Sequence, residues 1–333
     1  MARMTKARKP RIYVTQPVAK SAIARLRDVA TVTVNPDASR IIGRKALIAA
    51  VRRCDVLFCL LHDKIDAGVI TANSALRLVA AQSITPSNID VEAATARGIP
   101  VTVVPASTTE ATADLAFALM LAVARRVVEG DRMVRAGKFP GAQSGHLLGS
   151  FVWNKTLGLV GGGGLIGKAV ARRAQGFGMR VLYYTPRRKS ADEEQAAGLT
   201  YAPLDTLLAE SDFVSIHSPL NKETRHQIGA RELRLMKPTA YLINTARGPI
   251  VDETALTRAL ARKQIAGAGL DVFEHEPKVG KDLRGLTNVV LAPHIGSATA
   301  EVREGMANSV VDNIMAFLDG KRPPNCVNPQ VLS

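Results

Sequence analysis

Cysteine is scarce in this chain of 333 residues, which contains only Cys54, Cys59 and Cys326. Three cysteines are too few for a disulfide framework, and their spacing fits no zinc-binding motif. We therefore expect a protein of a reducing compartment without a metal site.

Long apolar runs are also lacking. The longest uncharged run, Leu115–Ala124, is about half of what a helix needs to cross a bilayer. The basic residues near the start lead directly into Ile12-Tyr13-Val14, without the apolar segment of a secretion signal. These absences predict a cytoplasmic protein with no membrane partner.

Acidic residues are fewer than basic ones. The chain has 44 Lys and Arg but 29 Asp and Glu, which gives a net charge of +15. Such a balance can indicate a nucleic-acid partner. The positive residues are nevertheless spread along the chain, and the dense clusters, the first eleven residues and Arg187-Arg188-Lys189, accompany no recognition motif. The sequence favours a basic protein that attracts small anions over a nucleic-acid binder.

Short apolar runs alternate with helix-length amphipathic stretches along the whole chain. This pattern predicts the α/β class, with parallel sheets wrapped by helices, and the length suggests two domains. The first series of expected strands is Arg11–Thr15, Val29–Val34, Asp55–Leu61, Leu76–Ala80 and Pro100–Val103. The second series is Thr156–Val160, Arg180–Tyr184, Phe213–Ile216, Ala240–Asn244, Ala266–Leu270 and Val289–Ala292.

Helices are expected between these strands. In the first series they cover Ala19–Arg27, Arg44–Arg53 and Val91–Arg97. A longer helix, opened by the capping hydroxyls of Ser107-Thr108-Thr109, should join the two domains. A final helix, Glu301–Leu318, should return to the first domain.

A glycine-rich turn follows the strand that ends at Val160. Gly162, Gly164 and Gly167 satisfy G-x-G-x-x-G, with a helical stretch and a further strand behind them. Glycine permits a tight turn and lets a pyrophosphate approach the backbone N–H groups at a helix N-terminus. The motif in this context predicts a dinucleotide site.

The end of the next strand bears on which dinucleotide binds. An NAD site normally has Asp or Glu there, about 20 residues after the glycines. This chain instead reads Tyr184-Thr185-Pro186-Arg187-Arg188-Lys189, with cations that could hold a 2′-phosphate. We predict a preference for NADP(H) over NAD(H), although the cations could also form only a solvated loop.

Polar residues follow four strands of the second series. They are His217, Arg247, Asp271 and His294. Ligands of open α/β sheets bind beyond the carboxyl ends of strands, so these side chains should share one crevice.

The residue types fit reduction of a 2-keto acid. Arginine can pair with a carboxylate, and histidine can supply the proton for the carbonyl oxygen. A carboxylate beside His294 would orient it and stabilise its charged form, and Glu276 is our candidate, with Glu274 as the rival. A surface Arg–Glu pair and a structural histidine are the alternatives.

Three segments resemble the signatures of the D-isomer-specific 2-hydroxyacid dehydrogenases. They are 243–253 (INTARGPIVDE), 269–277 (GLDVFEHEP) and 292–297 (APHIGS), and the resemblance extends from about Leu76 to Asn328. The segment 109–117 looks most like the glyoxylate and hydroxypyruvate reductase branch, which often uses NADPH. The resemblance implies a homodimer with Arg247, Glu276 and His294 as the catalytic group.

It also implies a Rossmann dinucleotide-binding domain, 106–299, inserted in a flavodoxin-like substrate domain made of 1–105 plus 300–333. Substrate would contact Ile84, Thr85, Arg247 and His294, and Asp271 would face the nicotinamide carboxamide. With Asp271, the cofactor contacts that the resemblance and the motifs together predict are Thr109, Gly162, Gly164, Leu165, Ile166, Gly167, Thr185, Arg187, Arg188, His217, Pro219, Thr224, Thr245, Ala246 and Gly296.

Two departures from the family pattern stand out. The family usually reads Val-Gly, an aromatic and an acidic residue in the loop whose backbone N–H groups hold the substrate carboxylate. This chain reads Ile84-Thr85-Pro86-Ser87, and proline has no N–H, so we expect an altered substrate pocket. One extra residue also stands between Val160 and the glycine fingerprint.

Two other functions stay open on the sequence. The same chemistry could serve another acid or oxoanion, such as 2-ketogluconate or phosphite. The fold also serves a nucleotide-sensing regulator, although a pure sensor need not keep Arg247, Glu276 and His294.

Overall fold

The computed structural model describes residues 8–332, which fold into two units. Unit 1 comprises the residues up to Ser107 and those from Thr299 onward, and unit 2 is Thr108–Ala298. The expected domain limits at Met1 and Ser333, and part of the basic N-terminal cluster, lie outside the described residues. Within the described part, no helix is both long and apolar enough to cross a membrane.

Unit 1 contains a five-stranded parallel sheet in the order β2-β1-β3-β4-β5, the flavodoxin order. Its strands are β1 (Arg11–Val14), β2 (Thr31–Val34), β3 (Val56–Leu60), β4 (Leu78–Gln82) and β5 (Val101–Thr102). Its helices are α1 (Lys20–Val29), α2 (Arg44–Val51), α3 (Ala67–Ile70), α4 (Val91–Ala96) and α13 (Ala300–Leu318), followed by the 3-10 turn η2 (Pro329–Leu332).

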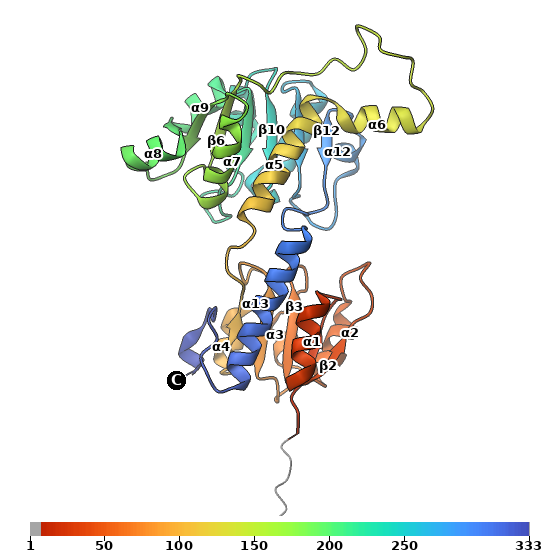
Figure 1. Cartoon of the computed structure of the whole chain (residues 1–333), viewed down its shortest axis with the longest axis vertical. Helices are drawn as coiled ribbons and strands as arrows, with labels where there is room; N and C mark the ends of the chain where they lie inside the picture. The colour runs from red at the N-terminus through yellow and green to blue at the C-terminus, as the bar shows by residue number, and fades with distance from the viewer. Residues whose placement is uncertain (1–7, 333) are drawn as a thin grey trace, which may run out of the picture. The chain divides into compact units, whose positions relative to one another are not determined.

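Alternation along the central strands explains why both faces of this sheet are covered. Val56 and Phe58 pack in the cluster formed with α1 and α13, whereas Leu57 and Cys59 pack on the opposite side with α2 and α3. Helix α13 runs beside α1, as Figure 1 shows, and Arg25 pairs with Asp312 across them. The expected return of the last helix to the first domain is confirmed.

Unit 2 contains a seven-stranded parallel sheet in the order β12-β11-β10-β9-β6-β7-β8. The strands are β6 (Thr156–Val160), β7 (Arg180–Tyr184), β8 (Thr200–Tyr201), β9 (Phe213–Ile216), β10 (Tyr241–Asn244), β11 (Gly267–Leu270) and β12 (Val289–Leu291). Counted from β6, this is the Rossmann order with an added edge strand, and the switch point lies between β6 and β9. The expected fold class is confirmed.

Helices cover both faces of this sheet. They are α5 (Thr109–Ala124), α6 (Val127–Arg135), α7 (Leu165–Gln175), α8 (Ala191–Ala197), α9 (Leu204–Glu210), α10 (Ala230–Leu235), α11 (Glu253–Ala261) and α12 (Lys281–Gly285), with the 3-10 turn η1 (Gly248–Ile250). Helices α5 and α7 pack on one face, and α9 to α12 pack on the other.

Several sequence expectations differ from the structure: β4 spans Leu78–Gln82 rather than Leu76–Ala80, and the short strand β8 was not expected. The helix expected to join the domains, α5, lies within unit 2, because Leu119 and Val123 pack in its core. The second expected strand begins at Thr31 rather than Val29, because Val29 completes the last turn of α1. Valine is β-branched and favours strands, but this preference is weak. For Val29 it is therefore overridden by the packing of the buried face of α1.

Candidate active site

The glycine turn lies at the switch point of unit 2. After β6, Gly161 adopts a left-handed conformation with φ of +84°, and its N–H donates to the Tyr184 carbonyl. Gly164 is the N-cap of α7, which begins at Leu165. A Cβ on Gly167 would lie 2.5 Å from the Gly162 Cα, so the first turn of α7 packs directly on the glycine turn.

Two buried polar atoms near this turn have no partner among the described residues. They are the Nδ1 of His217 and the Oγ1 of Thr245, at the ends of β9 and β10. The Nε2 of His217 lies 2.9 Å from the Ser215 Oγ, and burial lowers the pKa of His217 to about 4. His217 is therefore neutral near pH 7 and holds an unused hydrogen-bonding atom.

The residues at the switch point fit a dinucleotide. The N-terminal N–H groups of α7 have no acceptor within the helix, and the helix dipole adds partial positive charge there. A Cβ on Gly164 would have a single neighbour, 3.5 Å away, so packing within the protein does not by itself require glycine at this position. Unpartnered buried atoms at the adjacent strand ends are consistent with groups that a ligand would satisfy.

Beyond β7, the two arginines have different surroundings. The guanidinium of Arg188 makes two hydrogen bonds to Glu194, of 2.8 and 2.9 Å, and stacks over the ring of Tyr201. Hydrogen bonds from Arg188 and from Tyr183 hold the pKa of Glu194 at about 2. Arg187 is exposed and makes no ion pair with a described residue.

The remaining expected cofactor residues all belong to unit 2. The Thr224 hydroxyl donates to the Pro219 carbonyl and so fixes the loop after β9, while the Thr185 hydroxyl donates to the Arg187 carbonyl. The others occupy the first turns of α5 and α7 and the loops after β10 and β12: Thr109, Leu165, Ile166, Ala246 and Gly296.

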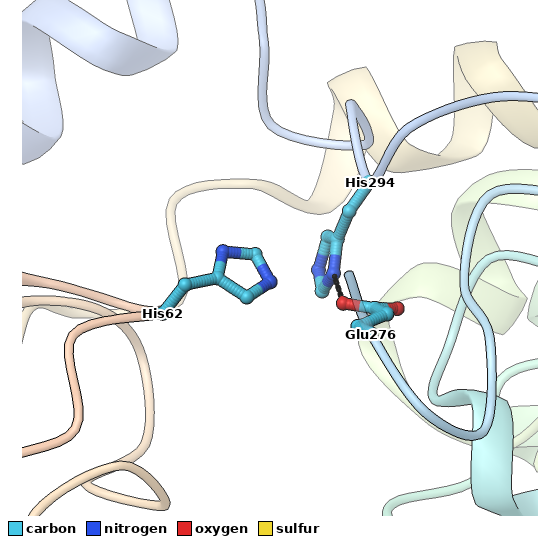
Figure 2. A group of neighbouring side chains, drawn as sticks. All are labelled: His62, Glu276 and His294. Atoms are coloured by element: carbon cyan, nitrogen blue, oxygen red, sulfur yellow. Dashed lines mark hydrogen bonds and ion pairs between the residues drawn. The ribbon is translucent and has the colours of Figure 1, made fainter. Parts of the chain in front are cut away.

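Glu276 and His294 form a direct pair in the loops that follow β11 and β12. The Oε2 of Glu276 lies 2.7 Å from the Nδ1 of His294, and the two side chains are 18% and 20% exposed (Figure 2). The Oε1 of Glu276 accepts from the Phe273 N–H, which fixes the carboxylate. The pair is oriented and still reachable from solvent.

Asp271 shapes the turn that presents His294. Its two carboxylate oxygens accept from the N–H groups of Ile295 and Gly296, and its carbonyl accepts from the His294 N–H. Burial raises the pKa of Asp271, and the two N–H groups lower it. His294 itself has a φ of +57°, a strained conformation that this clamp maintains.

Arg247 is brought toward the same loops by its glycine neighbour. A Cβ on Gly248 would lie 1.9 Å from the Phe273 carbonyl, so only glycine allows this close approach. Burial lowers the pKa of Arg247, and the nearby Glu276 charge opposes that shift. The Nη1 of Arg247 donates to the Ala246 carbonyl, so its other donors can serve a ligand.

Glu274, the rival carboxylate, serves a different histidine. Its Oε1 lies 2.7 Å from His226 Nε2, and its Oε2 accepts from the Glu253 N–H. The geometry therefore pairs Glu276, and not Glu274, with His294.

In unit 1, the loop after β4 presents backbone donors. The N–H groups of Ile84 and Thr85 meet no acceptor among residues 8–332. The Ser83 hydroxyl donates to the Thr85 carbonyl, and Asn88 donates to the carbonyls of Leu60 and Asp63. The loop is thus held in place while its two N–H groups remain available.

Comparisons with known proteins identify the family of the chain. The sequence model of the D-isomer specific 2-hydroxyacid dehydrogenase, NAD binding domain, matches residues 117–296. Glyoxylate reductases of Korarchaeum cryptofilum and Thermococcus litoralis are 50% and 48% identical to this chain, over 97% and 98% of both sequences. The chain belongs to the D-isomer-specific 2-hydroxyacid dehydrogenase family.

The fold of this dehydrogenase is also similar to that of a solved structure. The NADPH-dependent glyoxylate/hydroxypyruvate reductase of Sinorhizobium meliloti, in complex with NADP and malonate, has a TM-score of 0.80 at 32% identity. The match covers 96% of this chain and 97% of that chain. The dehydrogenase is an NAD(P)-dependent oxidoreductase that acts on a CH–OH group.

Sequence reasoning missed two residues that shape the site of the dehydrogenase. Glu194 engages one of the arginines assigned to the cofactor, and the acidic stretch 192–194 directly after the basic loop was the available signal. Gly248 lets the Arg247 loop approach Phe273, and nothing local in the sequence indicates that contact.

Proposed function

We propose that the dehydrogenase reduces glyoxylate and hydroxypyruvate to the corresponding 2-hydroxy acids, with NADPH as the preferred cofactor. The observation that carries this proposal is the Glu276–His294 pair, 2.7 Å apart, at the strand ends that also present Arg247. The names and identities of the relatives support the substrate class.

Each catalytic side chain has a role that follows from its surroundings. Arg247 stays charged despite its burial and binds the carboxylate and carbonyl oxygens of the keto acid. When bound, the cofactor would supply the hydride. His294, whose Nδ1 is held by Glu276, gives the proton on Nε2 to the carbonyl oxygen as negative charge develops there. Glu276 orients the ring and stabilises the imidazolium.

The cofactor is assigned to the switch point of unit 2. Gly162, Gly164, Gly167 and the N–H groups of Leu165 and Ile166 would hold its pyrophosphate. The nicotinamide half is assigned to Thr109, Pro219, Thr224, Ala246, Asp271 and Gly296, with His217 Nδ1 and Thr245 Oγ1 as partners that no described residue satisfies.

The preference for NADPH is assigned mainly to Arg187. Thr185 fixes the loop by donating to the Arg187 carbonyl, and the exposed guanidinium can meet a 2′-phosphate. Arg188 contributes less, because Glu194 already neutralises it.

We assign substrate binding to unit 1 as a discontinuous domain, 1–105 plus 300–333, around the cofactor domain, 106–299. The free N–H groups of Ile84 and Thr85 are suited to a carboxylate. Because Thr85 and Pro86 replace glycine and an aromatic residue of the family pattern, another small acid is the second candidate substrate. The three free cysteines support the cytoplasm as the location.

A homodimer is proposed from the segment that begins with α6. This helix and the chain behind it extend away from the sheet of unit 2 in Figure 1, and no residue of α6 is buried. Large apolar side chains are exposed along it: Val127, Val134, Phe139, Leu148, Phe151 and Trp153. A second copy of the chain would cover this surface.

The test is the loss of nicotinamide absorbance with NADPH and NADH in parallel, against glyoxylate, hydroxypyruvate, pyruvate and 2-ketogluconate. We expect turnover of glyoxylate and hydroxypyruvate, faster with NADPH. Turnover of 2-ketogluconate alone would move the assignment to the second candidate. Cofactor binding without any turnover would contradict the proposal.

A further inference from the structure

A hollow of about 310 Å³ lies between α10 and α11, on the outer side of the helical layer of unit 2. Its floor includes the small or buried side chains of Leu233, Ala255 and Ala259. This volume is at the lower end of ordinary ligand pockets, so it suits a metabolite rather than a dinucleotide. None of the residues that line it belongs to the cofactor or keto-acid site.

Three arginines line this hollow. Arg234 comes from α10, Arg258 lies in the last turn of α11, and Arg262 is the C-cap residue directly after that helix. Among residues 8–332, none of the three forms an ion pair, whereas Arg231, also on α10, pairs with Asp205 and Glu232. Like charges four residues apart on a helix repel each other, so a bound anion would reduce the repulsion between these arginines.

The neutral groups of the hollow also point to an acceptor-rich ligand. The Nε2 of Gln264 is buried and has no hydrogen-bond partner among the described residues, which is costly unless a ligand accepts from it. The carboxylate that lines the hollow, Asp252, is engaged as the cap of α11, where its Oδ1 accepts from the Ala255 N–H. The hollow therefore presents mainly unused donors.

We propose that this hollow is a binding site for a small phosphate monoester, separate from the active site. A phosphate group carries about −1.5 to −2 charges at neutral pH and several strong acceptor oxygens. Guanidinium forks can bind those oxygens in pairs, and the Gln264 amide supplies a neutral donor.

The proposal can be tested by calorimetric titration of inorganic phosphate into the full chain saturated with NADP⁺. Saturation occupies the glycine turn, so phosphate cannot bind there instead. We expect millimolar or tighter binding that weakens with added sodium chloride. The R258Q/R262Q variant should bind at least about tenfold more weakly, because it loses two charged donors.

The matched control is K281Q/R284Q, which removes two exposed charges from α12 of the same layer. It should bind phosphate as the unaltered chain does. Equal weakening in both variants would show a general charge effect and overturn the proposal, as would no binding at about 10 mM phosphate. Tighter binding of citrate than of phosphate would overturn the ligand class.

A second variant separates a ligand contact from a structural role. Gln264→Leu removes the unpartnered amide while keeping a similar size. It should weaken phosphate binding, yet the melting temperature without phosphate should stay unchanged or rise, because an unsatisfied donor is lost. Unchanged phosphate affinity in this variant would overturn the proposed site, because the Gln264 amide is one of its donors. Because the readout is binding and not turnover, failure here leaves the proposed dehydrogenase activity untouched.

Discussion

The two parallel sheets present different chemistry at the carboxyl ends of their strands. Unit 2 places ionisable side chains there, with Glu276 and His294 paired and Arg247 nearby. Unit 1 instead presents backbone N–H groups of Ile84 and Thr85, in a loop held by Ser83 and Asn88. The chemistry at the strand ends of unit 2 therefore depends on the identity of its side chains. The chemistry at the strand ends of unit 1 depends on the path of its backbone. Substitutions should affect the two units very differently.

The largest effect is expected from His294→Ala. Loss of a general acid typically costs 10²–10⁴-fold, so kcat/KM for glyoxylate should fall by about a thousandfold. The matched control is His226→Ala, which removes another histidine that contacts a carboxylate, Glu274. Steady-state kinetics of both variants checks the prediction. A comparable loss in the two variants would mean that His294 acts only through structure.

Arg247→Gln should lower kcat/KM by about a hundredfold, because the keto acid loses its charged, forked partner. Arg225→Gln is the control, since Arg225 pairs with Glu274 away from the proposed substrate contact. If Arg247→Gln keeps the kcat/KM for glyoxylate of the unaltered chain, Arg247 is not the charged partner of the keto acid.

His217 makes the stability of unit 2 depend on pH. Its folded pKa of about 4 lies below the ordinary value of 6.5, so the unfolded chain binds the proton first as the pH falls. Stability should therefore decrease between pH 6.5 and 4, by on the order of 2 kcal/mol. Thermal melting of the unaltered chain and of His217→Asn across this pH range checks the prediction. The variant should lack the loss of stability that protonation of His217 causes. Parallel pH profiles of the two proteins would be the contrary result.

Arg187→Ala should shift the ratio of NADPH to NADH efficiency by about tenfold toward NADH. Arg188→Ala should change that ratio less, because Glu194 already holds Arg188. Steady-state kinetics of both variants with NADPH and with NADH measures this ratio. A larger shift in Arg188→Ala would show that the Glu194 pair opens when the cofactor binds.

The smallest effect is expected from Thr85→Gly in unit 1. The substitution keeps the N–H group and removes only an exposed side chain, so KM for glyoxylate should change by no more than about threefold. A change of a hundredfold would show that the Thr85 side chain itself contacts the substrate, and the contrast between the units would fail.

The sequence predicted the alternating architecture and most strands well, because strands buried on both faces are continuous apolar runs. It also placed His294, Arg247 and Asp271 at strand ends. It named Glu276 as the partner of His294 but kept Glu274 as a rival, because both stand in one short loop and only the folded backbone directs one to His226 and the other to His294. The Arg188–Glu194 pair was missed for a similar reason, since it depends on how α8 packs beside β7.

The most direct test of the central claim compares Glu276→Gln with Glu274→Gln. The two carboxylates lie two residues apart, and each contacts a histidine at 2.7 Å. With glyoxylate and NADPH, we predict that Glu276→Gln loses most of its kcat/KM, while Glu274→Gln keeps activity close to that of the unaltered chain. Equal losses in the two variants, or a greater loss in Glu274→Gln, would contradict the assignment of the Glu276–His294 pair as the proton donor of this dehydrogenase.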